Sequence, residues 1–278
     1  MTEARKDIRR YLCSMAVQGN NLLYRCTEAE IEMKEEAERP ARKTEEKKPE
    51  AKIEKKDKMD LSNIETGIVF NTAEAVQDGL FAEKDASAKL DFSGDDMNSL
   101  AGKVSECERC SLSKSRTNTV FGAGDPRAGV VFVGEAPGRE EDLSGLPFVG
   151  RAGKLLEKIL DAIEFTREEV YIANILKCRP PDNRDPREDE VAACEPFLQK
   201  QLELMQPEVI CALGRVAAQT LLRTKSSLSK MRGKIHYYNR VKLIATYHPA
   251  ALLRNPHFKR PAWEDMKLLR AIYDRSGD

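Results

Sequence analysis

The turn GEAPG at residues 134–138 directly follows an apolar run, VVFV, and is the first segment that suggests chemistry. A glycine-rich turn after a strand lets backbone N–H groups approach an anion or a flat ligand. This turn is neither a dinucleotide fingerprint nor a Walker loop. Carboxylates crowd the place where a phosphate would lie, namely Glu135, Glu140, Glu141 and Asp142. These residues argue against a phosphate as its ligand.

Four cysteines form a second candidate site. Cys107 and Cys110 make a C-x-x-C pair, while Cys178 and Cys194 are separated by fifteen residues that include Pro180 and Pro181 directly after Arg179. Four thiolates in two separate pairs suit either zinc or an iron–sulfur cluster, and the spacing alone leaves both open. A redox pair or buried thiols are the plainer alternatives. Cys211 lies inside an apolar run, where a core thiol is expected.

The elements that would position these residues alternate between strand and helix. Apolar runs at 129–137, 170–178, 207–214 and 241–249 predict strands, and the periodic segments 153–163, 188–205, 215–222 and 262–275 predict helices. The alternation predicts a three-layer α/β/α domain with a mostly parallel, four-stranded central sheet. Ligands of such sheets bind beyond the carboxyl ends of the strands, so we expect the four following turns to converge on one pocket.

The first hundred residues differ from the rest of the chain in composition. Residues 1–27 predict a short amphipathic helix, and residues 28–99 predict a charged, disordered linker with one weak interaction segment around Ile68–Phe70. The folded domain is expected at 100–278. The N-terminal extension is a candidate for docking another protein, although a solvated tail is the simpler interpretation.

Charge and hydropathy narrow the class of protein. No apolar run is long enough to span a bilayer, and the N-terminus lacks a signal-peptide core, so a cytoplasmic protein without a membrane partner is expected. The net charge is zero. Residues 211–260 nevertheless hold eleven Lys and Arg and no Asp or Glu. Such a stretch favours a surface that meets a polyanion.

Five segments in order carry a resemblance to a known family. They are GEAPGREEDLSGLPFVGRAG, NILKCRPPDNRDP, CEPFLQKQLELMQPEVICALG, SKMRGKIHYY and YHPAALLRNP. Together they resemble the family 4 uracil-DNA glycosylases, which are iron–sulfur enzymes of the uracil glycosylase superfamily. The resemblance runs from about Leu100 to the C-terminus and does not include the N-terminal extension.

The resemblance implies a role for each matching residue. The four cysteines Cys107, Cys110, Cys178 and Cys194 match the ligands of a [4Fe–4S] cluster. Phe148 matches the aromatic residue that stacks on the flipped uracil, and Asn174 matches the residue that hydrogen-bonds its edge. The other matching positions are the first motif with Gly134, Ala136 and Gly138; the pocket residue Glu141; the second-motif His248; and the DNA-inserting loop with Leu252, Leu253 and Arg254. Glu135 and Asn183 are both candidates for activating water.

The implied activity is hydrolysis of the N-glycosidic bond of uracil in single- or double-stranded DNA, by a monomer in the bacterial or archaeal cytoplasm. The second strand runs on into its loop without the KRRIH insertion that lets some relatives trap the abasic product covalently, so turnover is expected. Two alternatives stay open at this point. One is a DNA-binding relative that has lost catalysis, and the other is a four-cysteine metal enzyme that acts on a free nucleotide. Lys177, Arg179 and Arg184 are expected to be presented to DNA by loops that the cluster pins.

Overall fold

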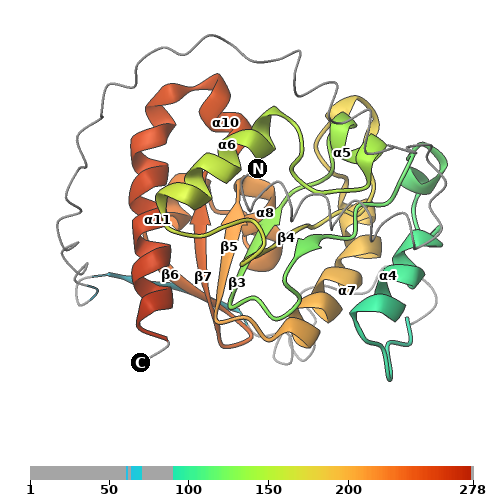
Figure 1. The fold of residues 1–278 in the computed structure, drawn as a ribbon, viewed down its shortest axis with the longest axis horizontal. Helices are drawn as coiled ribbons and strands as arrows, with labels where there is room; N and C mark the ends of the chain where they lie inside the picture. The colour runs from blue at the N-terminus through green and yellow to red at the C-terminus, as the bar shows by residue number, and fades with distance from the viewer. Residues whose placement is uncertain (1–60, 62–63, 71–89, 277–278) are drawn as a thin grey trace, which may run out of the picture. The chain divides into compact units, whose positions relative to one another are not determined.

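The computed structural model describes residues 61, 64–70 and 90–276. Its centre is a seven-stranded sheet in the order β1-β6-β7-β5-β3-β4-β2 (Figure 1). The strands are β1 (Thr66–Phe70), β2 (Ala123–Gly124), β3 (Val130–Gly134), β4 (Tyr171–Asn174), β5 (Val209–Leu213), β6 (Ile235–Tyr238) and β7 (Val241–Thr246). Four pairings are parallel, and the pairs β2–β4 and β6–β7 are antiparallel.

The four predicted strands are confirmed as β3, β4, β5 and β7, but the predicted strand count was too low. The three additional strands all lie toward the edges of the sheet, and each has a weak sequence signal. Strand β2 has only two residues, and β6 alternates partly buried with buried side chains beside a tight turn at Asn239–Arg240. Edge strands need less apolar sequence because only part of their surface is buried.

Helices cover both faces of the sheet, which confirms the three-layer architecture (Figure 1). One face packs its apolar side chains against α4 (Met97–Ser105), α7 (Glu188–Met205), α8 (Arg215–Leu221) and α9 (Leu228–Met231). The other packs against α6 (Arg151–Ala162) and α11 (Lys259–Asp274). Short helices complete the loops: η1 (Ser111–Lys114), α5 (Arg139–Ser144), η2 (Pro181–Asn183), α10 (Pro249–Arg254) and η3 (Pro256–Phe258).

Strand β1 corrects the prediction that residues 28–99 are a linker throughout. It pairs in parallel with β6, and the Ile68 backbone N–H donates to His236 Nδ1 at 2.7 Å. The ring of Phe70 stacks on Tyr238 with centroids 5.8 Å apart. The folded part also begins before residue 100, since α4 starts at Met97. The helix predicted within residues 1–27 and the rest of the predicted linker, 28–60 and 71–89, lie outside the described residues.

Among the helices in the described ranges, none is both long and apolar enough to cross a membrane.

Candidate active site

The predicted convergence of strand ends is confirmed. Gly134 at the end of β3 is the register partner of Asn174 at the end of β4. On the other side of β3, the ends of β5 and β7 meet at Leu213 and Thr246. The Gly214 backbone N–H donates to the Thr246 carbonyl at 2.8 Å, which joins the turn after β5 to the loop after β7. The turns that carry the sequence-predicted motifs therefore share one edge of the sheet.

Asn174 lies in the floor of this site. Its side chain is only 2% exposed, and Oδ1 has no hydrogen-bond partner within the described part of the chain. A Cβ placed on Gly134 would lie 2.3 Å from that oxygen and 2.8 Å from the ring of Phe148. Glycine is therefore required for Asn174 and Phe148 to approach the end of β3. A buried acceptor without a partner is costly, which marks Asn174 as a group that awaits a donor.

Phe148 is held in a strained conformation beside Asn174. Its φ is +53°, in the left-handed region that bulky residues avoid. The Arg167 guanidinium donates to the carbonyls of Phe148 (2.9 Å) and Pro147, and the close approach of Gly153 leaves no space for a side chain there. The ring centroid lies 5.4 Å from that of His248, with the planes at 32°. The Phe148 ring thus lies next to both the Asn174 carboxamide and the His248 ring.

His248 is the N-cap of α10, and its protonation state follows from its contacts. Nδ1 accepts the Ala250 backbone N–H at 3.1 Å, so the ring proton of the neutral form is on Nε2. Burial and then the nearby Arg254 lower the pKa of His248 to about 4, while Glu141 opposes them. At neutral pH the ring is therefore uncharged, with an Nε2–H available as a hydrogen-bond donor.

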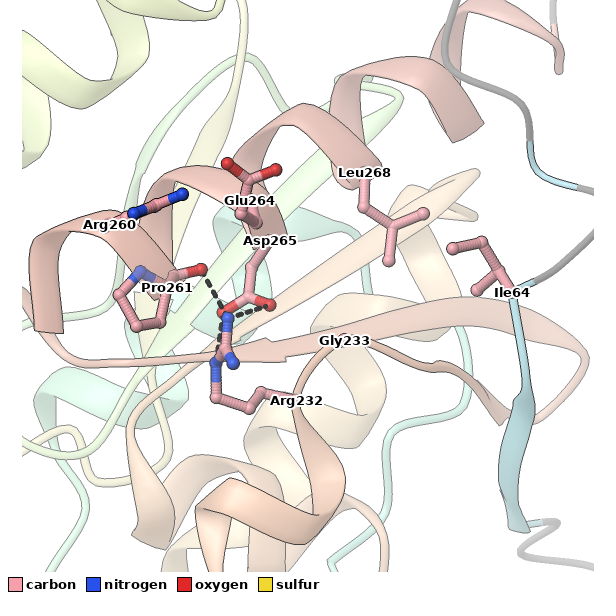
Figure 2. A pocket seen from close by; sticks show the side chains of 8 residues that line it. All are labelled: Ile64, Arg232, Gly233, Arg260, Pro261, Glu264, Asp265 and Leu268. Atoms are coloured by element: carbon pink, nitrogen blue, oxygen red, sulfur yellow. Dashed lines mark hydrogen bonds and ion pairs between the residues drawn. The ribbon is translucent and has the colours of Figure 1, made fainter.

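A polar network joins Thr246, two residues before His248, to α11. Figure 2 shows its Arg232, Asp265 and Pro261 members. Asp265 Oδ2 accepts from Thr246 Oγ1 at 2.8 Å, and Arg232 forms two hydrogen bonds of 3.0 Å with the same carboxylate. The guanidinium also donates to Pro261 O and lies 5.6 Å from the ring centroid of Tyr247. Arg232 and Asp265 line a pocket of about 410 Å³ that contains none of the predicted site residues.

Glu141 and Gly138 shape the first motif. Glu141 Oε2 accepts the Gly138 N–H at 3.1 Å, and Oε1 accepts the N–H groups of Val149 (3.0 Å) and Gly150 (2.9 Å). The carboxylate thus ties the start of α5 to the start of α6 and fixes the segment that ends in Phe148. Its prediction as a pocket-lining group remains untested, but its oxygens already have these three donors. Ala136 packs partly buried against the core.

The two candidates for water activation have different environments. Burial and the neighbouring Asp185 raise the pKa of Glu135 to about 6, against the lowering effects of Arg215 and Arg254. Asn183 instead lies exposed at the end of η2 with φ +52°, and its Oδ1 accepts from Arg179 Nε at 2.7 Å. Only Glu135 follows directly on a residue of the pocket floor, Gly134.

The predicted DNA-inserting loop needs a correction. Leu252 is 3% exposed and belongs to the core, whereas Leu253 is 41% exposed and Arg254 is also exposed. Consecutive residues of a helix point about 100° apart, so α10 cannot present all three side chains to solvent. Leu253 and Arg254 are the two that could reach DNA.

The acid-free stretch 211–260 also carries less unbalanced charge than its sequence indicates. Four of its eleven cations pair with acids from other segments. These pairs are Arg215–Asp185, Arg223–Glu195, Arg232–Asp265 and Lys234–Glu65.

The four predicted cysteine ligands come together. Cys107, Cys110, Cys178 and Cys194 line one small pocket between α4 and α7. Sulfur accepts N–H donors from both sides: Arg116 Nη1 lies 3.5 Å from Cys178 Sγ, and the Lys177 backbone N lies 3.2 Å from Cys194 Sγ. Burial raises the pKa of Cys178 and raises that of Cys194 to about 12, so a bound metal centre would have to stabilise the thiolates.

The donor set fits a sulfur-ligated centre with ligands spread over several elements. Over the described ranges, no three His, Cys, Asp or Glu side chains are grouped to hold a single metal ion. Four cysteine side chains around one pocket suit either a zinc ion or an iron–sulfur cluster. Cys211 is fully buried in β5, as predicted for a core thiol.

The prediction that Lys177 is presented to DNA is also wrong. It is 1% exposed and therefore cannot be presented to DNA. Its Nζ donates to the Asn174 carbonyl at 2.9 Å and to Gln201 Oε1 at 2.6 Å. Burial lowers the pKa of Lys177 to about 8. A lysine among prolines and arginines is normally predicted to be exposed. No signal in a single sequence distinguishes a buried lysine from an exposed one.

Comparisons with known proteins agree with this arrangement. The family described as Uracil DNA glycosylase superfamily matches residues 121–267. A type-4 uracil-DNA glycosylase of Archaeoglobus fulgidus is 46% identical over 62% of this chain and 90% of its own length. Those of Saccharolobus solfataricus and Thermotoga maritima are 42% and 43% identical over 63% and 65% of this chain, and over 86% and 96% of their own lengths.

By these matches the chain belongs to the uracil-DNA glycosylase superfamily. Within the superfamily, the matched relatives place it among the type-4 enzymes. The resemblance found in the sequence motifs is confirmed.

Proposed function

We propose that this protein is a monofunctional uracil-DNA glycosylase that flips uracil out of DNA and hydrolyses its N-glycosidic bond, leaving an abasic site for base excision repair. The observation that carries the proposal is the unpartnered Asn174 Oδ1, which is buried beside Phe148, whose ring in turn lies 5.4 Å from that of the neutral His248. A flat, uncharged base with donors and acceptors along one edge suits this space, and the turn of the first motif borders it.

Uracil is selected by the polarity of its edge. Its N3–H can donate to Asn174 Oδ1, and its O4 can accept from the Asn174 amide. Cytosine has an acceptor at N3 and a donor at C4, which would leave buried groups unpaired. Such a mismatch is strongly disfavoured in a site built to hydrogen-bond its ligand. Stacking of the base on Phe148 would return about 1–3 kcal/mol of the cost of extrusion.

Bond cleavage leaves negative charge on the departing base and positive charge on the sugar. The Nε2–H of His248 is the donor for uracil O2, where the negative charge develops. A neutral ring suits this role because its donor is fixed by the backbone bond at Nδ1 and needs no proton uptake. Arg254 lies close enough to His248 to lower its pKa, and its charge would also favour the anionic leaving group.

Water is activated by Glu135 in this proposal. A carboxyl group with a pKa of about 6 is ionised at neutral pH and still basic enough to accept a proton from water. Asn183 is the alternative, as a residue that orients the water rather than deprotonating it.

The duplex is held open by the exposed end of α10. Leu253 would fill the gap left by the flipped base, and Arg254 would bind the adjacent backbone. The protein would act as a monomer on single- or double-stranded DNA in a bacterial or archaeal cytoplasm, and its N-terminal extension is a candidate for docking another protein.

The four cysteines would hold a [4Fe–4S] cluster. The cluster would cross-link the segment after α4, the loop after β4 and the start of α7, which together stand behind Asn174. Its contribution in this proposal is structural, because the proposed hydrolysis needs no electron transfer.

The test is cleavage of end-labelled oligonucleotides that carry a single dU, dT or dC, in single- and double-stranded form, by protein with its full iron content. An alkali-labile site at dU alone, with no covalent protein–DNA product, supports the proposal. Binding of the dU duplex without cleavage would identify a DNA-binding relative that has lost catalysis.

A further inference from the structure

We propose that Lys177 is a positioning residue for base recognition, which fixes the Asn174 peptide and connects it to the cysteine pocket. The inference rests on the proposed function and assigns a further residue to it. Lys177 uses both of its ends: the side-chain Nζ donates to the Asn174 carbonyl, and the backbone N–H donates to Cys194 Sγ.

Burial of the Lys177 ammonium is energetically unfavourable if its only role is to hydrogen-bond one carbonyl group. Removing an ammonium group from water is unfavourable unless strong hydrogen bonds replace its hydration. No carboxylate within the described ranges forms an ion pair with Lys177, and the partners of Nζ are Asn174 O, Gln201 Oε1 and the face of Phe121, whose centroid is 6.0 Å away. A charge-assisted hydrogen bond is, however, shorter and stronger than a neutral one. A firm hold on the Asn174 peptide would explain the presence of a charge at this position.

The partners of Lys177 are themselves held rigidly. Gln201 is fully buried on α7, and its Nε2 donates to the Phe121 carbonyl at 3.0 Å and to the Tyr171 hydroxyl at 3.3 Å. The Lys177 carbonyl accepts the Val120 N–H at 2.8 Å. The ammonium therefore sits in a fixed frame, and the frame includes the helix that carries Cys194.

If Lys177 positions Asn174, its loss should affect binding of DNA that contains uracil differently from binding of DNA with an abasic site. In the proposed function Asn174 binds the base and not the backbone, so its displacement should weaken binding of uracil but not of a site that lacks a base. A residue needed merely for stability would weaken both equally or neither.

The experiment measures equilibrium binding of two duplexes by iron-replete protein. One carries 2′-deoxy-2′-fluorouridine, whose bond resists hydrolysis because fluorine destabilises the sugar cation, and the other carries a tetrahydrofuran abasic analogue. For Lys177→Met we expect affinity for the first to fall about 10- to 100-fold, with no change for the second. Lys200→Met is the matched control, because Lys200 precedes Gln201 on α7 and is 14% exposed, but its ammonium pairs with the exposed Glu203.

Lys177→Gln provides a second variant should the Met protein not fold or load iron, since it is neutral, polar and too short to reach both acceptors. We expect the same selective loss. An equal loss of affinity for both duplexes would overturn this inference but not the proposed function. So would variants that unfold at a lower temperature but keep the wild-type ratio of affinities for the two duplexes. Wild-type protein that does not prefer the fluorouridine duplex over a thymidine duplex would instead overturn the proposed function, and this inference with it.

Discussion

Replacement of Gly134 by alanine tests the geometry of the pocket floor. The new Cβ would lie 2.3 Å from Asn174 Oδ1 and 2.8 Å from two ring atoms of Phe148. Ordinary C···O and C···C contacts are about 3.3 and 3.5 Å or more, so both groups must retreat by about 0.7–1 Å. Arg167 holds only the Phe148 backbone carbonyl, so the Phe148 ring and the Asn174 carboxamide must both shift. A misplacement of about 1 Å costs about 100-fold in rate, so we expect kcat/KM on dU to fall by about that factor.

The assay is single-turnover cleavage of a dU duplex, combined with thermal unfolding. The backbone of Gly134 is not in the left-handed region, so alanine is conformationally allowed and the defect should be in catalysis. Gly102→Ala is the matched control, because a Cβ there meets nothing within 4 Å. A Gly134→Ala enzyme that cleaves dU at the wild-type rate would refute the placement of Asn174 and Phe148 against β3.

Three further predictions concern other parts of the molecule. Leu253→Ala should slow cleavage in duplex DNA without changing thermal stability, whereas Leu252→Ala should lower the free energy of unfolding by about 2–5 kcal/mol; equal stability loss in both would contradict the assigned orientation of α10. The value of kcat/KM should rise as the pH increases through about 6, because Glu135 loses its proton there and becomes a base. If the same rise in the pH–rate profile persists in Glu135→Gln, Glu135 is not the base. Gly67→Ala should detach β1, because the added Cβ would lie 2.3 Å from His236 Cε1; a calorimetric melting temperature equal to that of wild type would contradict this packing, and the dU cleavage rate should stay unchanged.

The sequence predicts the central strands well because their burial leaves a direct signal. The fully buried strands β3 and β5 are apolar or small at every position, and the helices between strands show clear periodicity. Strand β1 could not be predicted in the same way. Its residues lie within a charged region, and its place in the sheet depends on a hydrogen bond to His236, which is 168 positions away from Ile68.

The sequence also predicted some residues of the candidate site and not others. The strand pattern predicted which turns lie at one edge of the sheet, but Asn174 and His248 were singled out within those turns by the family resemblance. The direction of a side chain in a short helix is harder to foresee, which is why Leu252 and Leu253 could not be told apart. Lys177 was misplaced for a related reason: its burial depends on Gln201 from a distant helix, and a single sequence carries no trace of that partnership.

The most direct test of the central claim is the single-turnover rate of dU cleavage by wild type and by His248→Ala, both with full iron content. The account predicts an alkali-labile site at dU with wild type and a loss of about 100-fold or more in the variant, as for removal of one donor to a developing oxyanion. Cleavage at the wild-type rate by His248→Ala would show that the leaving group is stabilised elsewhere and would contradict the account.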